Sequence, residues 1–262
     1  MAEITARGLR FHVQTLGPAE APCPVVFLHG LVMDNLSSFY FTLANPVAER
    51  ARVVLYDLRG HGLSERPREG YTLDDMVSDL DALLIALRIE GEIDLVGHSF
   101  GGLLAIAFAA RSPGRVRRMV LLEGHLGAKG WGDKMAETLA LQGEERDQRI
   151  VSAFSTWLGR SSARKRSRLA ETAKALVEGT TLIEDMRRSP PVQDGAIAGI
   201  ESRVLAIYGV SSDLRPEAER VIQLLPHAEL RLVEGATHSV LWEATADVRA
   251  MIVGWLGGDP RC

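Results

Sequence analysis

The chain has 262 residues, of which 46% are hydrophobic and 24% are charged, and its formal net charge at pH 7 is -4. This length suits one α/β domain, or one domain with an insertion, and it is enough to bury a large core. The small negative charge excludes a general attraction to nucleic acid or to an anionic membrane surface.

Neither the amino terminus nor the cysteines indicate export or metal binding. Residues 1–5 lack the basic patch and the apolar core of a signal peptide, and no apolar run approaches the ~18 residues of a membrane span. Cys23 and Cys262 lie near opposite ends of the chain, a spacing that indicates neither a disulfide framework nor a metal site. We therefore expect a cytoplasmic protein with no membrane and no nucleic-acid partner.

Strands and helices are predicted to alternate along the chain. A lead-in hairpin over residues 3–16 precedes buried strands at residues 24–28, 52–56, 93–96, 118–122, 203–208 and 229–233. Helices are predicted at residues 37–49, 71–89, 102–110, 216–225 and 242–256. Such alternation requires right-handed crossovers and a mostly parallel sheet.

One interval breaks this alternation with helical patterns and no convincing strand. We predict a helical cap over residues 125–199, inserted into a core formed by residues 1–124 and 200–262. A cap above the carboxyl ends of the strands would cover the place where open α/β sheets bind ligands, and would exclude water from it. Its bulky apolar residues are candidates for packing or for substrate contact: Trp131, Met135, Phe154 and Trp157.

The most informative stretch is Gly97-His98-Ser99-Phe100-Gly101, between a predicted strand and a predicted helix. A Gly-x-Ser-x-Gly sequence in that setting is typical of a nucleophile elbow, a sharp turn that holds the serine in a strained conformation. Gly97 and Gly101 are expected because a Cβ at either position would collide with the neighbouring turn. Ser99 is therefore the candidate nucleophile.

Two histidines also follow predicted strands. His238, in Gly235-Ala236-Thr237-His238, is placed to take the proton of Ser99 and return it to a leaving group. His29, in His29-Gly30, is interpreted as holding its loop in place rather than as a chemical group.

These motifs, together with the turn Asp57-Leu58-Arg59-Gly60-His61-Gly62-Leu63-Ser64, resemble the α/β-hydrolase family in its lid-bearing esterase and lactonase-like branch. The resemblance covers most of the chain. It implies an eight-stranded, mainly parallel sheet with a helical cap inserted after the sixth strand, and no metal or organic cofactor. It also implies that the backbone N–H groups of Leu31 and Phe100 form the oxyanion hole.

The acid of the triad is where the chain departs from the family pattern. The family places an aspartate three residues after a glycine at the end of the seventh strand, but here the slot after Gly209 holds Ser212, and Asp213 comes one residue late. Glu123 closes the sixth strand, where some family members carry their acid. We favour Glu123 and keep Asp213, or no functional acid, as alternatives.

Several other residues have weaker signals. Asp57 and His61 are interpreted as structural, His98 as pointing away from substrate, and Trp242 as packing the last helix. Substrate contact is considered for Gly30 and His125 besides the cap residues. The basic run of the cap is interpreted as a solvated helix face or as a docking patch for the phosphopantetheine of CoA or a carrier protein: Arg160, Arg164, Lys165, Arg166 and Arg168.

The predicted activity is acyl transfer to water, with a carboxylic ester or a lactone as substrate. A serine at position 99 argues against the halide and epoxide chemistries that use an aspartate nucleophile in this family. A thioester is the nearest alternative substrate, and carbon–carbon cleavage and perhydrolysis use the same triad. A slow-turnover ligand receptor and an inactive structural homologue are alternatives from other classes, and a homodimer is left open.

Overall fold

The computed structural model describes residues 2–127, 133 and 163–257, with the backbone alone for residues 163–170. Its sheet has eight strands in the order β1-β2-β4-β3-β5-β6-β7-β8. The strands are β1 (Ala2–Ala6), β2 (Leu9–Leu16), β3 (Val25–Leu28), β4 (Val53–Tyr56), β5 (Ile93–His98), β6 (Val116–Leu122), β7 (Arg203–Gly209) and β8 (Ala228–Val233). β2 is antiparallel to both of its neighbours, β1 and β4. All the other neighbouring strands, from β4 through β3, β5, β6 and β7 to β8, run parallel to one another. The predicted mainly parallel, eight-stranded sheet is confirmed.

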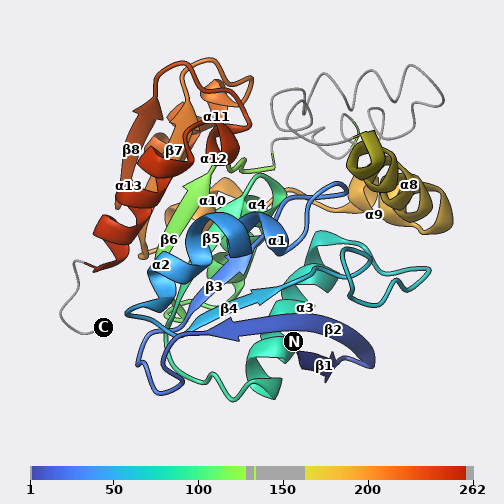
Figure 1. Cartoon of the computed structure of the whole chain (residues 1–262). Helices are drawn as coiled ribbons and strands as arrows, with labels where there is room; N and C mark the ends of the chain where they lie inside the picture. The colour runs from blue at the N-terminus through green and yellow to red at the C-terminus, as the bar shows by residue number, and fades with distance from the viewer. Residues whose placement is uncertain (1, 128–132, 134–162, 258–262) are drawn as a thin grey trace.

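Helices cover both faces of this sheet (Figure 1). They are α1 (Ser37–Phe39), the π-helix η1 (Tyr40–Ala44), α2 (Asn45–Ala48), α3 (Leu73–Ala86), α4 (Phe100–Arg111), α8 (Ala163–Gly179), α9 (Leu182–Arg188), α10 (Asp194–Ala198), α11 (Arg215–Leu224), α12 (Val240–Glu243) and α13 (Thr245–Gly257). Residues of α3, α4, α10 and α11 belong to one buried apolar cluster, and residues of α1, η1, α2, α12 and α13 belong to the other.

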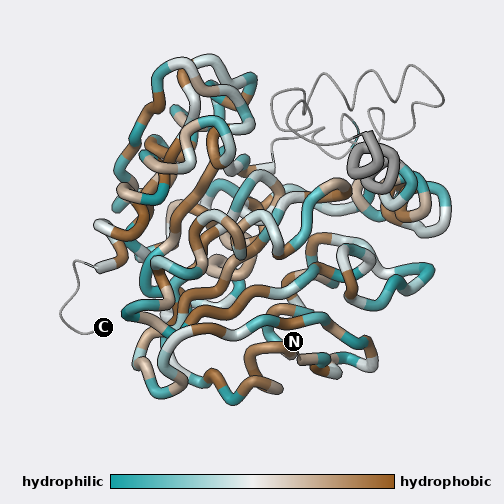
Figure 2. Tube along the Cα trace, viewed as in Figure 1, coloured by the Kyte–Doolittle hydropathy of each residue, from teal (hydrophilic) through white to brown (hydrophobic). Residues whose placement is uncertain are grey.

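The central strands are apolar on both faces because each face is covered by helices. In β3, Val26 and Leu28 pack into the cluster that contains α4, whereas Val25 and Phe27 pack into the cluster that contains α13. Hydrophobic residues accordingly run almost without interruption along the middle strands (Figure 2). These strands form a rigid support for the loops at their carboxyl ends.

Local sequence explains where the longer helices begin. The side chain of Thr72 accepts a hydrogen bond from the N–H of Asp75, whose carboxylate bonds back to Thr72, so that α3 starts with a capping box. α4 is apolar almost all round, because one side lies on the sheet and another on α3 and α10. α3 begins two residues after the predicted start at residue 71, and α4 begins two residues before the predicted start at residue 102.

The described part of the segment between β6 and β7 contains the helices α8, α9 and α10 and no strand, as predicted for the cap. α9 is tied to the core because buried Asp185 accepts hydrogen bonds from the N–H of Tyr71, at 2.8 Å, and from the hydroxyl of Thr181, at 2.5 Å. The division into a core and a cap at residues 125 and 199 stays a prediction. Cys23, in the loop before β3, is disulfide-bonded, which the spacing of the two cysteines did not predict.

Candidate active site

Ser99 lies between β5 and α4 in a strained backbone conformation, with φ 52° and ψ -116°. A Cβ on Gly97 would overlap the carbonyl oxygen of Gly101, and a Cβ on Gly101 would overlap the carbonyl oxygen of Leu28. Only glycine therefore fits on either side of the serine. The sharp turn predicted from the sequence is present, and it places Ser99 at the amino end of α4.

His238 reaches Ser99 from the loop after β8. Its Nε2 lies 3.2 Å from the hydroxyl oxygen of Ser99, and a quarter of its side chain remains exposed. The preceding residue, Thr237, is hydrogen-bonded to Glu243 of α12. The Glu243 carboxylate accepts the N–H of Thr237 at 2.7 Å and the hydroxyl of Thr237 at 3.0 Å. This loop is thus fixed on the side away from the serine.

Glu123 approaches the other nitrogen of the same imidazole. Its Oε2 lies 3.3 Å from Nδ1 of His238, and its side chain is fully buried. The carboxylate also accepts the N–H of Gly209 on Oε1, at 2.6 Å, and the hydroxyl of Ser212 on Oε2. Asp213, the rival acid, is exposed. The structure therefore brings Glu123 to His238, and Ser212, in the family's usual slot for the acid, donates a hydrogen bond to it.

Backbone strain is concentrated around these residues. Among the described residues, five non-glycine residues have positive φ, and three of them lie here: Val32 at 68°, Ser99 at 52° and Glu123 at 50°. Each such conformation costs of order 1–3 kcal/mol and persists only where the surroundings enforce it. Such strain clusters at functional sites, which is consistent with a site at this edge of the sheet.

The loop after β3, residues 29–36, brings Leu31 toward Ser99 and is anchored by the turn after β4. His61 accepts the N–H of Val32 on Nε2, at 2.7 Å, while its Nδ1 lies 2.8 Å from the carbonyl oxygen of Arg59. Burial, together with the nearby His29, lowers the pKa of His61 to about 3, so its ring is neutral. No described residue accepts the N–H of Leu31.

Two further residues of this region hold the loop, as predicted. His29 accepts the N–H of Leu58 on Nε2, at 2.9 Å, and the carboxylate of Asp57 accepts the N–H of Leu36 at 2.8 Å. The side chains of Asp57 and His29 therefore accept backbone N–H groups, which agrees with the structural roles predicted for them from the sequence.

A cavity of about 320 Å³ opens beside the serine. It is lined by Gly30, Leu31, Met33, Asp34, His98, Ser99, His238 and Trp242. Gly30 was predicted to be there. Trp242 packs against the buried cluster of the last helices, as predicted, and it also lines this cavity. His98 lines the cavity as well, although it was expected to point away. Met33 and Asp34 were missed, since neither belongs to a recognisable motif.

The remaining predicted substrate contacts have different outcomes. His125 is buried and is not among the lining residues of this cavity, so its contact with substrate stays a prediction. Burial, followed by the proximity of His238, lowers the pKa of His125 to about 3. The candidates Trp131, Met135, Phe154 and Trp157 and the basic residue Arg160 lie outside the described residues, and the other basic residues of the cap lie on α8, where only the backbone is described.

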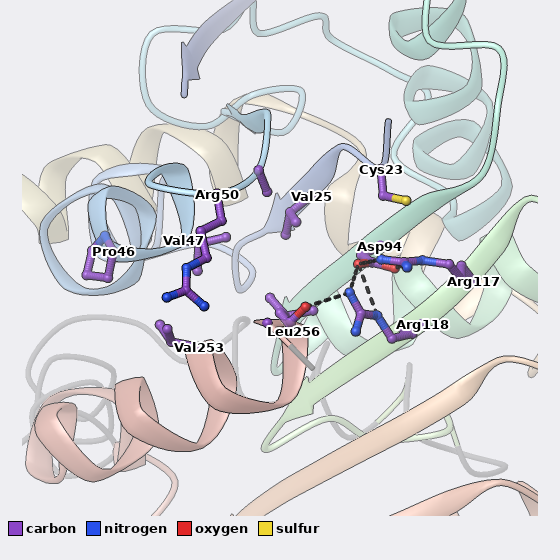
Figure 3. Close-up of a pocket in the computed structure, with 12 residues that line it drawn as sticks. Cys23, Val25, Pro46, Val47, Arg50, Asp94, Arg117, Arg118, Val253 and Leu256 are labelled. Atoms are coloured by element: carbon purple, nitrogen blue, oxygen red, sulfur yellow. Dashed lines mark hydrogen bonds and ion pairs between the residues drawn. The ribbon is translucent and has the colours of Figure 1, made fainter. Parts of the chain in front are cut away.

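A larger cavity, of about 460 Å³, lies at the opposite end of the sheet (Figure 3). Its polar lining includes Asp94, Arg117 and Arg118, at the amino ends of β5 and β6, and Asp94 is already paired with both arginines. Its lining includes none of Ser99, His238 and Glu123. Size alone therefore does not identify the candidate site, because the smaller cavity is the one lined by Ser99 and His238.

Within the described part of the chain, no group of three or more His, Cys, Asp or Glu side chains is arranged to hold a metal ion. No described helix is both long and apolar enough to cross a membrane.

Comparison with known proteins places this geometry in a family. Residues 24–202 match the family described as alpha/beta hydrolase fold. The chain belongs to the α/β-hydrolase family. The eight-stranded, mainly parallel sheet is the one that the resemblance implied.

Three proteins illustrate the similarity. The chain is 34% identical over 122 residues to cis-3-alkyl-4-alkyloxetan-2-one decarboxylase of Shewanella oneidensis, covering 45% of this chain and 37% of that protein. It is 40% identical over 122 residues to 2-hydroxymuconate semialdehyde hydrolase of a Pseudomonas species, covering 46% of this chain and 42% of that protein. These matches thus span less than half of either relative.

The enol-lactonase of Burkholderia xenovorans has a similar structure, with a TM-score of 0.76 at 21% identity, over 98% of this chain and 100% of that chain. At this identity the likeness shows the fold alone.

Proposed function

We propose that the chain is a serine hydrolase that cleaves a carboxylic ester or a lactone through an acyl-enzyme on Ser99. The observation that carries the proposal is the continuous line from the Ser99 hydroxyl to Nε2 of His238, at 3.2 Å, and from Nδ1 of His238 to the Glu123 carboxylate, at 3.3 Å. In the absence of substrate such hydrogen bonds are commonly long, and they shorten in the reacting complex.

Each residue then has a defined part in the reaction. Ser99 attacks the carbonyl carbon while His238 takes its proton, and Glu123 orients the imidazole and stabilises its charged form. The N–H groups of Leu31 and Phe100 stabilise the oxyanion. His238 next protonates the leaving alcohol, and it later activates the water that releases the acid and restores Ser99.

The relatives support this substrate class and one alternative. An oxetan-2-one is a four-membered lactone, and the name of the Shewanella protein refers to it. The Pseudomonas relative is a hydrolase of 2-hydroxymuconate semialdehyde, which favours carbon–carbon cleavage as the second candidate. Both reactions would use the same serine and histidine, so the choice depends on the pocket and its cap.

The experiment is a parallel assay of wild type, Ser99→Ala and Ser112→Ala on p-nitrophenyl esters, lactones, an acyl-CoA and a vinylogous 1,5-diketo acid. Ser112 follows the last residue of α4, the helix that Ser99 precedes, and provides a matched control. We expect wild type and Ser112→Ala to turn over an ester or lactone and to be labelled by a fluorophosphonate. Ser99→Ala should lose labelling and, on the order of 10⁴-fold or more, turnover.

Other results would change the assignment. Retained turnover in Ser99→Ala would refute the nucleophile. A wild-type protein that is neither labelled nor active on any substrate would refute the hydrolase. Preference for the diketo acid would select carbon–carbon cleavage, and preference for acyl-CoA would select a thioesterase.

A further inference from the structure

Asp34 is a buried carboxylate with four hydrogen-bond donors around it. Its Oδ2 accepts the N–H of Gly30, at 2.8 Å, and lies 3.4 Å from Nδ1 of His98. Its Oδ1 accepts the N–H of Asn35, at 2.8 Å, and the hydroxyl of Ser38. Only 9% of the side chain is exposed. One carboxylate therefore ties together both ends of the loop after β3.

The carboxylate of Asp34 keeps its charge despite this burial. Burial by itself raises its pKa, but the hydrogen bond from His98, the nearby imidazoles of His29 and His98 and the hydrogen bond from Ser38 lower the pKa to about 2. Asp34 is therefore an anion throughout the neutral pH range, and a strong acceptor for the loop.

His98, the partner of Asp34 across the cavity, is held in place by packing. It is the last residue of β5 and directly precedes Ser99, and only 3% of its side chain is exposed. Its ring lies 5.5 Å from the ring of His238 and stands edge-on to the ring of Trp242 at 5.1 Å. With both neighbours in contact, the imidazole has little freedom to turn away from Asp34.

The two donors of the proposed oxyanion hole come from different segments of the chain. Leu31 is in the loop after β3, and Phe100 begins α4 after β5. The two strands pair as far as Leu28 and Gly97, which leaves the donors beyond the last paired residues. The Asp34–His98 contact crosses between the same two segments at the level of the donors, because both residues line the cavity with Ser99 and Leu31.

We propose that Asp34 and His98 form a positioning bridge that sets the spacing between the Leu31 and Phe100 donors. The bridge rests on the proposed function, since it assigns a role to donors that only an acyl-transfer reaction uses. His61 holds the other side of the loop through Val32, so the bridge completes a clamp around the strained segment. Neither side chain contacts the reacting atoms, and both act through the backbone that they hold.

Asp34→Asn tests the bridge with little change in size. The amide keeps one acceptor oxygen, so it cannot serve all four donors of the carboxylate. The measurements are kcat and KM on the best p-nitrophenyl ester, inhibition by a boronic acid or trifluoromethyl ketone that mimics the tetrahedral intermediate, and inhibition by the product acid. We expect kcat and affinity for the mimic each to fall about 10-fold, less than the ~10²-fold loss of a whole donor, with less than a 3-fold change for the product.

His98→Gln approaches the same bridge from the nucleophile side and provides the test if Asp34→Asn does not fold. The double variant should be no worse than the poorer single variant, since both remove one connection. Asp94→Asn is the matched control, because Asp94 is a buried carboxylate on the same strand as His98, at the opposite end. It should lower the melting temperature and leave the ratio of mimic to product affinity at the wild-type value.

The possible failures are distinguishable. If wild type turns over the ester and the Asp34 and His98 variants match it within 2-fold, the bridge is refuted while the hydrolase stands. Equal losses of mimic and product affinity would reduce the pair to a structural role. A wild type without turnover and without fluorophosphonate labelling would refute the proposed function itself.

Discussion

The two ends of strand β5 are built in opposite ways. At the amino end, Asp94 binds the guanidinium groups of Arg117 and Arg118, and all three side chains are at most 5% exposed. Arg118 also donates to the carbonyl oxygens of Trp255 and Leu256, which fastens the end of α13 to the sheet. Figure 3 shows the contact with Leu256. This end is saturated with charge-assisted contacts between buried side chains.

At the carboxyl end, the backbone is strained and both contacts of the His238 imidazole are longer than 3 Å. The contact between Ser99 and His238 is 3.2 Å long and the contact between His238 and Glu123 is 3.3 Å long. Ser99 and Glu123 both have positive φ. One strand thus separates a region that holds the fold together from a region where the backbone is strained and where we propose that protons are transferred. A substitution at one end should change stability, and a substitution at the other should change rate.

The largest expected effect is on rate, at the carboxyl end. Glu123→Gln should lower kcat by roughly 10³–10⁴-fold, because the amide no longer stabilises the charged imidazole and favours the wrong tautomer. Asp213→Asn, on an exposed residue, should stay within 2-fold of wild type. The measurement is kcat on the best ester, with melting temperatures to confirm folding. The reverse order of losses would make Asp213 the acid and break the comparison.

The next effect is on stability, at the amino end. Arg118→Met should cost about 3 kcal/mol of unfolding free energy, because it leaves Asp94 with one fewer buried partner and frees two carbonyl oxygens of α13. Its kcat should match wild type.

An exposed ion pair provides the control for Arg118→Met. The pair Arg111–Asp74 is 36% and 81% exposed, so Arg111→Met should cost less than about 1 kcal/mol. Urea unfolding of the three proteins measures both values. Equal losses in Arg118→Met and Arg111→Met, or a fall in kcat in Arg118→Met, would show that the two ends are not distinct.

The fold and half of the site could be predicted because their signals are local. Strand periodicity, the glycines around Ser99 and the position of His238 after the last strand are all visible in short stretches of sequence. Choosing between Glu123 and Asp213 was different, because the direction of each side chain depends on a turn. The positive φ of Glu123, which aims its carboxylate at His238, has no signature in a non-glycine residue.

Asp34 and the cavity contact of Trp242 were not predicted for a second reason, which is that they depend on contacts between distant segments. Asp34 acquires its role only when the loop after β3 folds back so that Gly30 and Asn35 donate to one carboxylate. Trp242 lies on a short helix where apolar spacing predicts packing, and it does pack, but against His98 at the edge of the cavity. Contacts between segments far apart in sequence decided both cases.

The smallest effect concerns the loss of unfolding free energy at low pH, which should come from groups at the carboxyl end of β5 alone. Arginines do not titrate in the accessible range, whereas the folded-state pKa of His125 is lowered to about 3, by burial and then by His238. The pKa of this histidine in the unfolded chain is about 6.5. Below that pH the unfolded chain therefore binds a proton at His125 that the folded chain does not bind, and the stability decreases as the pH is lowered. His125→Gln should remove about 1.5 kcal/mol of the loss between pH 6.5 and pH 5.

Urea unfolding of wild type, His125→Gln and Arg118→Met at both pH values measures this difference. Arg118→Met should be less stable than wild type at each pH but lose the same amount between them, because no titrating group has changed. His125→Gln should lose less, whatever its stability at pH 6.5. If His125→Gln lost as much as wild type, the imidazole at the carboxyl end would not resist protonation, and acid sensitivity would have to arise elsewhere in the fold.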